Sequence, residues 1–207
     1  MRTNFNCLKI FAAIIPALLL GGCMIPKSSI EDLSGINKAT DVIIVGRIEM
    51  VPKIAKEEVA VKMTIGGDEL YRQFMLRVKN DVGETTNYTT DVDNMVVVKT
   101  EEDYYISSDR SEPFRIFGGW FYTELHGGAG IATSTVLYRI KGGVQVEIPK
   151  GADAVYVGDI KFKRDEFFNL KDISFSQDDF EAAQKRFQKK FKTKMHLVKA
   201  KITAVKQ

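Results

Sequence analysis

Short β-branched runs, each closed by turn-forming residues, limit the fold of this chain more than any other feature. They recur from Asp41 to Phe162, and no helical pattern separates them. A parallel α/β sheet needs a helix between consecutive strands, whereas a β-sandwich uses short strands and frequent turns. We therefore predict a mainly β, antiparallel β-sandwich-like domain. Its strands are expected at residues 42–48, 59–65, 73–78, 95–98, 104–106, 114–125, 131–140, 144–148 and 154–162.

Glycine pairs interrupt this pattern at two places. Gly118-Gly119 lies inside the run 114–125, and glycine within a strand often marks a bulge or a close backbone approach. Lys141-Gly142-Gly143-Val144 separates two alternating runs and is typical of a hairpin turn. Separate strands are therefore expected on either side of residues 141–144.

One amphipathic helix is predicted near the C-terminus. Ser176 is the expected N-cap, and acidic residues fill the first turn, where the helix dipole favours them. Residues 197–205 then alternate apolar and polar, which predicts a last strand and a helix packed back on the sheet. Four residues at spacings of three and four form the apolar face of the helix: Phe180, Ala183, Phe187 and Phe191.

A hydrophobic run at residues 10–20 ends in Leu20-Gly21-Gly22-Cys23. It contains Pro16 and is shorter than the ~20 apolar residues of a membrane-spanning helix. Arg2 and Lys9 precede it, as in the positive region of an export signal. The arrangement resembles the lipobox of bacterial lipoproteins. The alternative is an ordinary secretory signal with a chance cysteine.

The resemblance to bacterial lipoproteins implies cleavage before Cys23, lipidation of its sulfur and acylation of the new amino group. It divides the chain into a lipoprotein signal peptide (1–22), a lipidated polar tether (23–40) and a β-rich globular domain (41–207). Met24 follows the cysteine in place of Asp, which in Gram-negative lipoproteins implies sorting to the outer membrane. We expect a lipid-anchored protein of the cell outer membrane.

The composition argues against several other classes of protein. Of the 30 basic residues, Arg2 and Lys9 lie in the predicted leader, and the remaining 28 nearly balance 27 acidic residues. So small a net charge gives no reason to expect a nucleic-acid partner. Cys7 and Cys23 are the only cysteines, so the predicted domain has neither a disulfide nor a thiolate metal site.

The sequence contains no recognisable catalytic constellation. Glu124 and His126 would share one face of a strand, but a metal site needs three or four ligands, so a polar strand face is the simpler interpretation. Residues 127–130 lack the Gly-Lys-Ser/Thr ending of a phosphate-binding loop and predict a flexible turn. We assign no catalytic residue, no metal and no cofactor.

Charge is distributed unevenly along the chain. No acidic residue follows Glu181, whereas nine basic residues do. A basic helix face is suited to lipopolysaccharide, phospholipid headgroups or an acidic protein. The alternative is an ordinary solvated helix face that carries no partner. The candidate contacts with an anionic surface are Lys185, Arg186, Lys189, Lys190 and Lys192.

Adjacent aromatic residues recur at Tyr104-Tyr105, residues 120–122 and Phe167-Phe168. Neighbours in a strand face opposite sides, so these rings either dock a ligand or bury one ring in the core and one beneath the helix. The strand around residues 119–122 and the Ile-Pro-Lys-Gly-Ala run at 148–152 resemble transthyretin-like and carboxypeptidase-regulatory-like β-domains. No functional residue is carried over from either family.

The expected function is that of a non-enzymatic envelope lipoprotein, a binding or scaffold component with the membrane and an unidentified envelope protein as partners. The alternative is an envelope hydrolase whose Asp and Glu residues are dispersed in the sequence. A deep pocket with two carboxylates of raised pKa would favour the hydrolase. A flat aromatic or basic patch would favour the binding protein.

Overall fold

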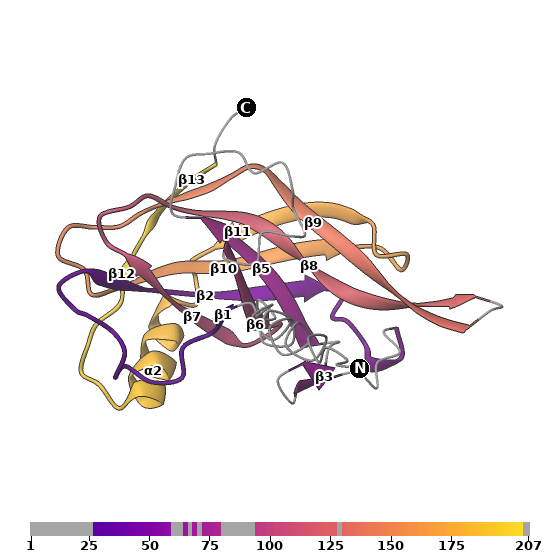
Figure 1. The fold of residues 1–207 in the computed structure, drawn as a ribbon. Helices are drawn as coiled ribbons and strands as arrows, with labels where there is room; N and C mark the ends of the chain where they lie inside the picture. The colour runs from indigo at the N-terminus through magenta and orange to yellow at the C-terminus, as the bar shows by residue number, and fades with distance from the viewer. Residues whose placement is uncertain are drawn as a thin grey trace, which may run out of the picture.

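The computed structural model describes residues 27–58, 64–65, 68–69, 72–79, 94–127 and 130–204 (Figure 1). Two helical elements are present in these ranges, the 3₁₀ turn η1 (Lys56–Glu58) and the helix α2 (Phe180–Phe191). The strands are β1 (Lys27–Ser28), β2 (Asp41–Val51), β3 (Thr64–Ile65), β4 (Asp68–Glu69), β5 (Gln73–Lys79), β6 (Met95–Lys99), β7 (Asp103–Asp109), β8 (Phe114–Gly127), β9 (Gly130–Glu147), β10 (Ala154–Arg164), β11 (Leu170–Ser176), β12 (Val198–Lys199) and β13 (Lys201–Ala204).

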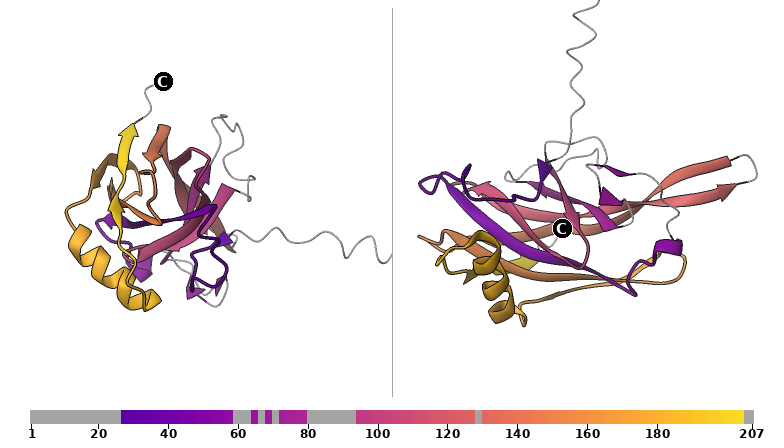
Figure 2. Two further views of the ribbon diagram at one scale, coloured as in Figure 1. Left: turned by 90° about the vertical axis from the view of Figure 1, so that its left-hand side faces the viewer. Right: turned by 90° about the horizontal axis from the view of Figure 1, so that it is seen from below.

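Two main sheets face each other, which confirms the predicted mainly β, sandwich-like fold (Figure 2, left). Among the described strands, the first sheet has the order β1-β6-β5-β8-β9-β13 and the second has the order β11-β10-β2-β7. Most neighbours are antiparallel, but β2 and β10 run parallel over residues 43–51 and 154–163. In the first sheet β1 also runs parallel to β6, so both sheets are mixed, whereas antiparallel pairing was predicted.

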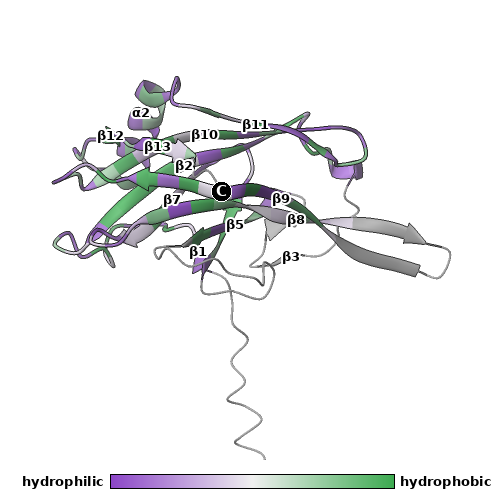
Figure 3. Ribbon diagram, turned by 90° about the horizontal axis from the view of Figure 1, so that it is seen from above, coloured by the Kyte–Doolittle hydropathy of each residue, from purple (hydrophilic) through white to green (hydrophobic). Residues whose placement is uncertain are grey.

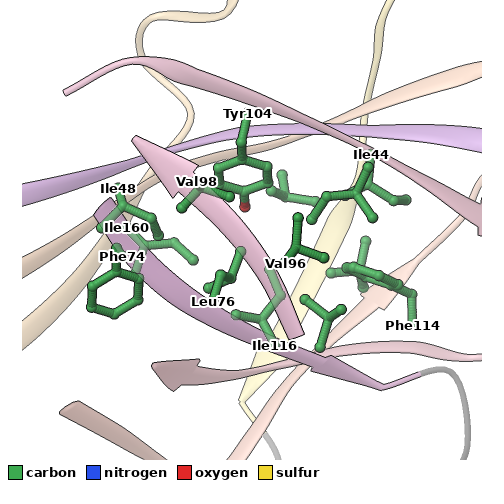
Figure 4. Packing of buried hydrophobic residues seen from close by; sticks show 14 of the residues in the cluster. Ile44, Ile48, Phe74, Leu76, Val96, Val98, Tyr104, Phe114, Ile116 and Ile160 are labelled. Carbon is green, nitrogen blue, oxygen red and sulfur yellow. The ribbon is translucent and has the colours of Figure 1, made fainter. Parts of the chain in front are cut away.

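The core lies between the two sheets. Ile44 and Ile48 of β2 point inward and share one apolar cluster with Phe74 and Leu76 of β5, and all four are fully buried (Figure 4). The alternation of hydrophobic and hydrophilic residues along the strands follows from this packing (Figure 3). β2 is also covered on its other face, where Ile43 belongs to a second apolar cluster beneath α2. A strand buried on both faces reads as a continuous apolar run.

Paired aromatic residues are buried on two sides, as one of the two alternatives predicted. Tyr104 points into the core between the sheets, whereas Tyr105 belongs to the cluster beneath α2. Phe121 lies in the core, and its neighbour Trp120 lies in a third cluster on the outer face of the first sheet. Phe167 differs, because its side chain is 75% exposed at the β10–β11 turn.

The C-terminal segment contains two short strands where one was predicted. β12 runs parallel to β10, and β13 runs antiparallel to β9 in the other sheet. The chain changes sheet at Ala200, which is buried and whose N–H donates to the Tyr156 carbonyl at 3.0 Å. Alternation continues through this residue, so the sequence pattern does not reveal the change of partner. The segment closes one side of the sandwich.

The start of the folded domain lies earlier than the predicted boundary at Asp41. β1 pairs in parallel with β6, and the Ile30 N–H donates to the Tyr105 carbonyl of β7 at 2.9 Å. Ile30, Leu33 and Ile36 pack against the cluster beneath α2. Residues from Lys27 onward therefore belong to the sandwich. The mostly polar composition of this segment predicted a tether, although its three apolar residues pack on the domain.

The helix also begins later than predicted. Asp179 occupies the N-cap position, and the helix covers Phe180–Phe191. Ser176 ends β11, and its hydroxyl accepts the Asp178 N–H at 3.1 Å in a local turn. This bond is an alternative to the capping bond, since serine side chains stabilise both arrangements. The predicted apolar face is confirmed, with Ala183 and Phe187 fully buried.

The predicted hairpin at residues 141–144 is wrong. β9 is a continuous strand through Gly142 and Gly143, which have φ angles of 69° and 76°. Opposite them the pairing with β8 shifts register between Ile116 and Gly118. The glycines belong to a large bulge, in which residues 140–143 of β9 oppose Phe117 of β8, because conformations with positive φ serve bulges as well as turns.

Candidate functional site

The outer face of the second sheet becomes polar where β10 contains a bulge. Pairing of β10 with β2 shifts register between Tyr156 and Gly158. Gly158 has a φ of 98°, and a Cβ atom there would lie 2.2 Å from the Ser176 carbonyl oxygen. The extra residue brings Tyr156 and Asp159 to the same face, although their spacing of three would place them on opposite faces of a regular strand.

Asp159 lies beneath the N-terminal end of α2 with 5% of its surface exposed. Burial raises the pKa of its carboxyl group, and the hydrogen bond from the Tyr156 hydroxyl to Asp159 Oδ1, at 3.0 Å, opposes that rise. Nearby, the Gln177 side chain donates to the backbone carbonyls of Tyr156 and Ala200. These bonds connect β10, the segment before α2 and the crossing to β13.

A network of ion pairs joins α2 to β2 and β7. Asp103, whose side chain is 5% exposed, accepts hydrogen bonds from Arg47 Nη2 at 2.8 Å and from Arg186 Nε at 2.5 Å. Arg186 also donates to Asp179 Oδ2 at 2.6 Å, across two turns of the helix. Hydrogen bonding to Asp103 raises the pKa of the Arg186 guanidinium. The network fixes the position of the helix on the sheet.

An open cleft of about 520 Å³ lies beside this network, between α2 and the β6–β7 turn. One wall carries Arg186, Lys189 and Lys190, and the opposite wall carries Glu101 and Glu102. Several of these charges are already paired within the protein: Glu101 with Lys53, Glu102 with Arg72, and Lys190 with Glu31.

Catalysis by the cleft carboxylates would require them to exchange protons with a substrate. The oxygens of Asp103 already accept four hydrogen bonds from Arg47 and Arg186. The geometry of this carboxylate is that of a structural ion pair. Asp103 thus gives no support to the hydrolase alternative, whose carboxylate site stays a prediction.

Four of the five predicted contacts with an anionic surface lie on α2 and the fifth, Lys192, is its C-cap, but the five differ in their surroundings. Arg186 is bound to two carboxylates. Lys190 pairs with Glu31 at 2.6 Å, and its ammonium group lies 5.3 Å from the centre of the Tyr105 ring. Lys185, Lys189 and Lys192 are exposed and make no ion pair within the described part of the chain. We call these three residues, together with the exposed Lys194 that follows the helix, the basic surface.

Other predicted site residues fall beyond what the structure describes. Cys23 and Met24 lie outside the described residues, so their predicted roles stay predictions. Glu124 and His126 lie in β8, where the structure describes only the backbone. Across all side chains that are described, no three His, Cys, Asp or Glu residues are placed to hold a metal ion. No helix in the described ranges is long and apolar enough to cross a membrane.

The Arg47–Asp103–Arg186–Asp179 network was not predicted from the sequence. Arg47 and Asp103 are directly opposite in the β2–β7 pairing, although 56 residues separate them in the chain. Only the strand register brings them together, and no spacing in the sequence encodes it. The clearest signal available was Arg186 itself, a basic residue at the edge of the apolar stripe of an amphipathic helix.

The fold and the site define a mixed β-sandwich protein with a helix held on one face by ion pairs and with a surface of lysines that form no ion pair with any described residue. Comparison with known proteins gives no match: no family model fits the chain, and no curated protein or solved structure is significantly similar to it.

Proposed function

We propose that this protein is a bacterial outer-membrane lipoprotein that acts as a non-enzymatic binding or scaffold component of the envelope. The observation that carries the proposal is Leu20-Gly21-Gly22-Cys23, directly after a short hydrophobic run. Lipidation of Cys23 would supply several acyl chains, and each buried CH₂ contributes about 0.8 kcal/mol to membrane binding. Several chains give a stable anchor where a single chain is marginal.

The early start of the folded domain supports a position close to the membrane. Lys27 already pairs with β6, and four peptide units separate it from Cys23. An extended chain of that length spans at most about 14 Å. A lipid on Cys23 would therefore keep the sandwich within a short distance of the headgroups.

The basic surface supports a contact between α2 and an anionic surface. Glu31 joins α2 through Lys190, so the helix is connected to a segment only eight residues from Cys23. Each lysine near an anionic membrane contributes about 1 kcal/mol, and the effect declines as salt shortens the screening length. A tethered domain also needs little intrinsic affinity, because the anchor raises its effective concentration.

Detergent phase partitioning tests the anchor. In a host that processes lipoproteins, we expect the wild-type protein in the detergent phase and Cys23→Ala in the aqueous phase. Cys7→Ala is the matched control, because Cys7 lies within the predicted leader and its loss is expected to leave partitioning unchanged. Equal partitioning of the wild type and Cys23→Ala would contradict the proposal.

A further inference from the structure

Strands β8 and β9 extend beyond the sheet that contains them. The pairing of β8 with β5 ends at Trp120, whereas the pairing of β8 with β9 continues to Gly127 and Gly130. Residues 121–127 and 130–136 therefore pair only with each other, as far as the described strands show. We call this ribbon the β8–β9 arm. It projects from one end of the sandwich both in the view of Figure 1 and in the view from below (Figure 2, right).

The two edges of the arm present backbone N–H and C=O groups that no described strand pairs. An isolated two-stranded ribbon is marginally stable in water, and an open edge is a template for another strand. Proteins usually protect such edges with lysine, proline or a bulge. The arm portion of β9 has none of the three, since residues 130–136 read Gly-Ile-Ala-Thr-Ser-Thr-Val.

We propose that the β8–β9 arm associates with the arm of a second copy of this chain, β9 against β9, antiparallel across a two-fold axis. Such an axis places one residue opposite its own copy and every other residue opposite the residue equally far on the other side of the axis, so charges of one sign along the strand would repel those of the copy. The arm portion of β9 carries no charge, whereas that of β8 carries Glu124. The β-branched and uncharged composition of residues 131–136 is also typical of segments that pair with themselves.

A cysteine scan of β9 tests both the pairing and its register. In the full chain with Cys7 and Cys23 replaced by serine, no other cysteine remains. Single cysteines are then placed at each position from 131 to 137, and the purified protein is mildly oxidised. Disulfides form when Cα atoms lie about 4.4–6.8 Å apart, a range that facing residues of antiparallel strands satisfy.

We expect one position to form covalent dimers at least tenfold faster than Lys194→Cys, an exposed control outside the arm. Rates are expected to fall with distance from that position, because only residues near the two-fold axis face their own copies. Cross-linking no faster than that of the control at every position would overturn the proposal.

Sedimentation of the same cysteine-free chain provides a second readout. We expect a monomer–dimer equilibrium and a dissociation constant at least tenfold weaker for Thr135→Lys, which places like charges on the paired strands. Glu112→Lys, in an exposed turn before β8, adds a lysine elsewhere and is expected to leave the equilibrium unchanged. A chain that stays monomeric at all concentrations, or a dimer that Thr135→Lys leaves intact, would overturn the proposal.

Discussion

Gly158 determines which side chains lie beneath α2, because the bulge in β10 forms at this residue and only glycine fits there. Its φ of 98° and its contact with the Ser176 carbonyl leave no space for a side chain. The bulge brings Asp159 to the face that already holds Tyr156, so a carboxyl group is buried beside a phenol. A charged carboxylate in that position has a desolvation cost, because burial removes its hydrating water and the Tyr156 hydroxyl that replaces it is a neutral donor.

Asp159→Asn is therefore expected to stabilise the protein at neutral pH. Burial raises the pKa of Asp159 above the usual 3.8 of an aspartate side chain. A carboxyl group of this kind favours the folded state below its unfolded pKa, and that stability is lost as pH rises through the folded pKa. Asparagine accepts the same hydrogen bond from Tyr156 without a charge. Urea unfolding at pH 7 and at pH 3 measures the effect, and an equal difference between variant and wild type at both values would contradict the assignment.

Glu58→Gln is expected to destabilise the protein by about 3–5 kcal/mol, because it leaves a buried guanidinium without its ionic partner. The Arg164 side chain is fully buried and donates to both Glu58 carboxylate oxygens, at 3.0 and 2.7 Å. Asp172→Asn is the control, since Asp172 and Lys163 form an exposed pair worth less than about 1 kcal/mol. Similar losses of unfolding free energy for the two variants would show that the burial of Arg164 does not matter.

The same ion pair predicts a contribution to acid unfolding. The hydrogen bonds from Arg164 lower the pKa of Glu58 below the usual 4.5 of a glutamate side chain. Its stabilising effect is therefore present above 4.5 and is lost as pH falls through the lowered folded-state value. Glu58→Gln is expected to flatten the pH dependence of stability in that acidic range. A pH profile parallel to that of the wild type would argue against the contribution.

At the scale of elements, α2 is held by an apolar stripe and by ion pairs at its edge. Phe187 is fully buried against the second sheet and contacts the Tyr105 ring, with 6.1 Å between the ring centres. Phe187→Ala is expected to lower the free energy of unfolding by about 3–5 kcal/mol, and Lys189→Ala, on the exposed face, to change it little. Urea unfolding measures both. An unchanged midpoint for Phe187→Ala would mean that the helix does not contribute to the fold.

The sequence predicted those strands and helices whose apolar pattern does not depend on which element they pair with. β2, β5, β6, β7 and β10 lie where apolar runs end at turn residues, and the apolar face of α2 follows its spacing. The change of sheet at Ala200 was missed because alternation continues through it. The continuous course of β9 was missed because glycine pairs serve bulges as well as turns. The Asp103 network was missed because strand register alone assembles it.

At the scale of the whole molecule, the fold connects the start of the domain to its basic surface. Residues 27–36 lie between the predicted anchor and the cluster that supports α2. We expect residues 24–207, without lipid, to bind anionic liposomes more tightly than neutral ones, with the preference decreasing at high salt. Replacing Lys185, Lys189 and Lys192 with glutamate is expected to weaken this binding by roughly 100-fold or more, at about 1 kcal/mol per lysine.

A control on another surface makes this comparison specific. Lys171 is 60% exposed on β11, outside the basic surface, and pairs with Asp165. Lys171→Glu is expected to leave liposome binding nearly unchanged. Equal binding to anionic and neutral liposomes, or an equal loss for the two sets of substitutions, would identify the lysines of α2 as ordinary solubilising charge.

Intact-mass measurement of the protein from membranes of a lipoprotein-processing host tests the central claim most directly. The account predicts a chain that begins at Cys23 and carries the added mass of a diacylglycerol and an amide-linked acyl group. A mature chain with an unmodified N-terminus, or one that retains residues 1–22, would contradict it.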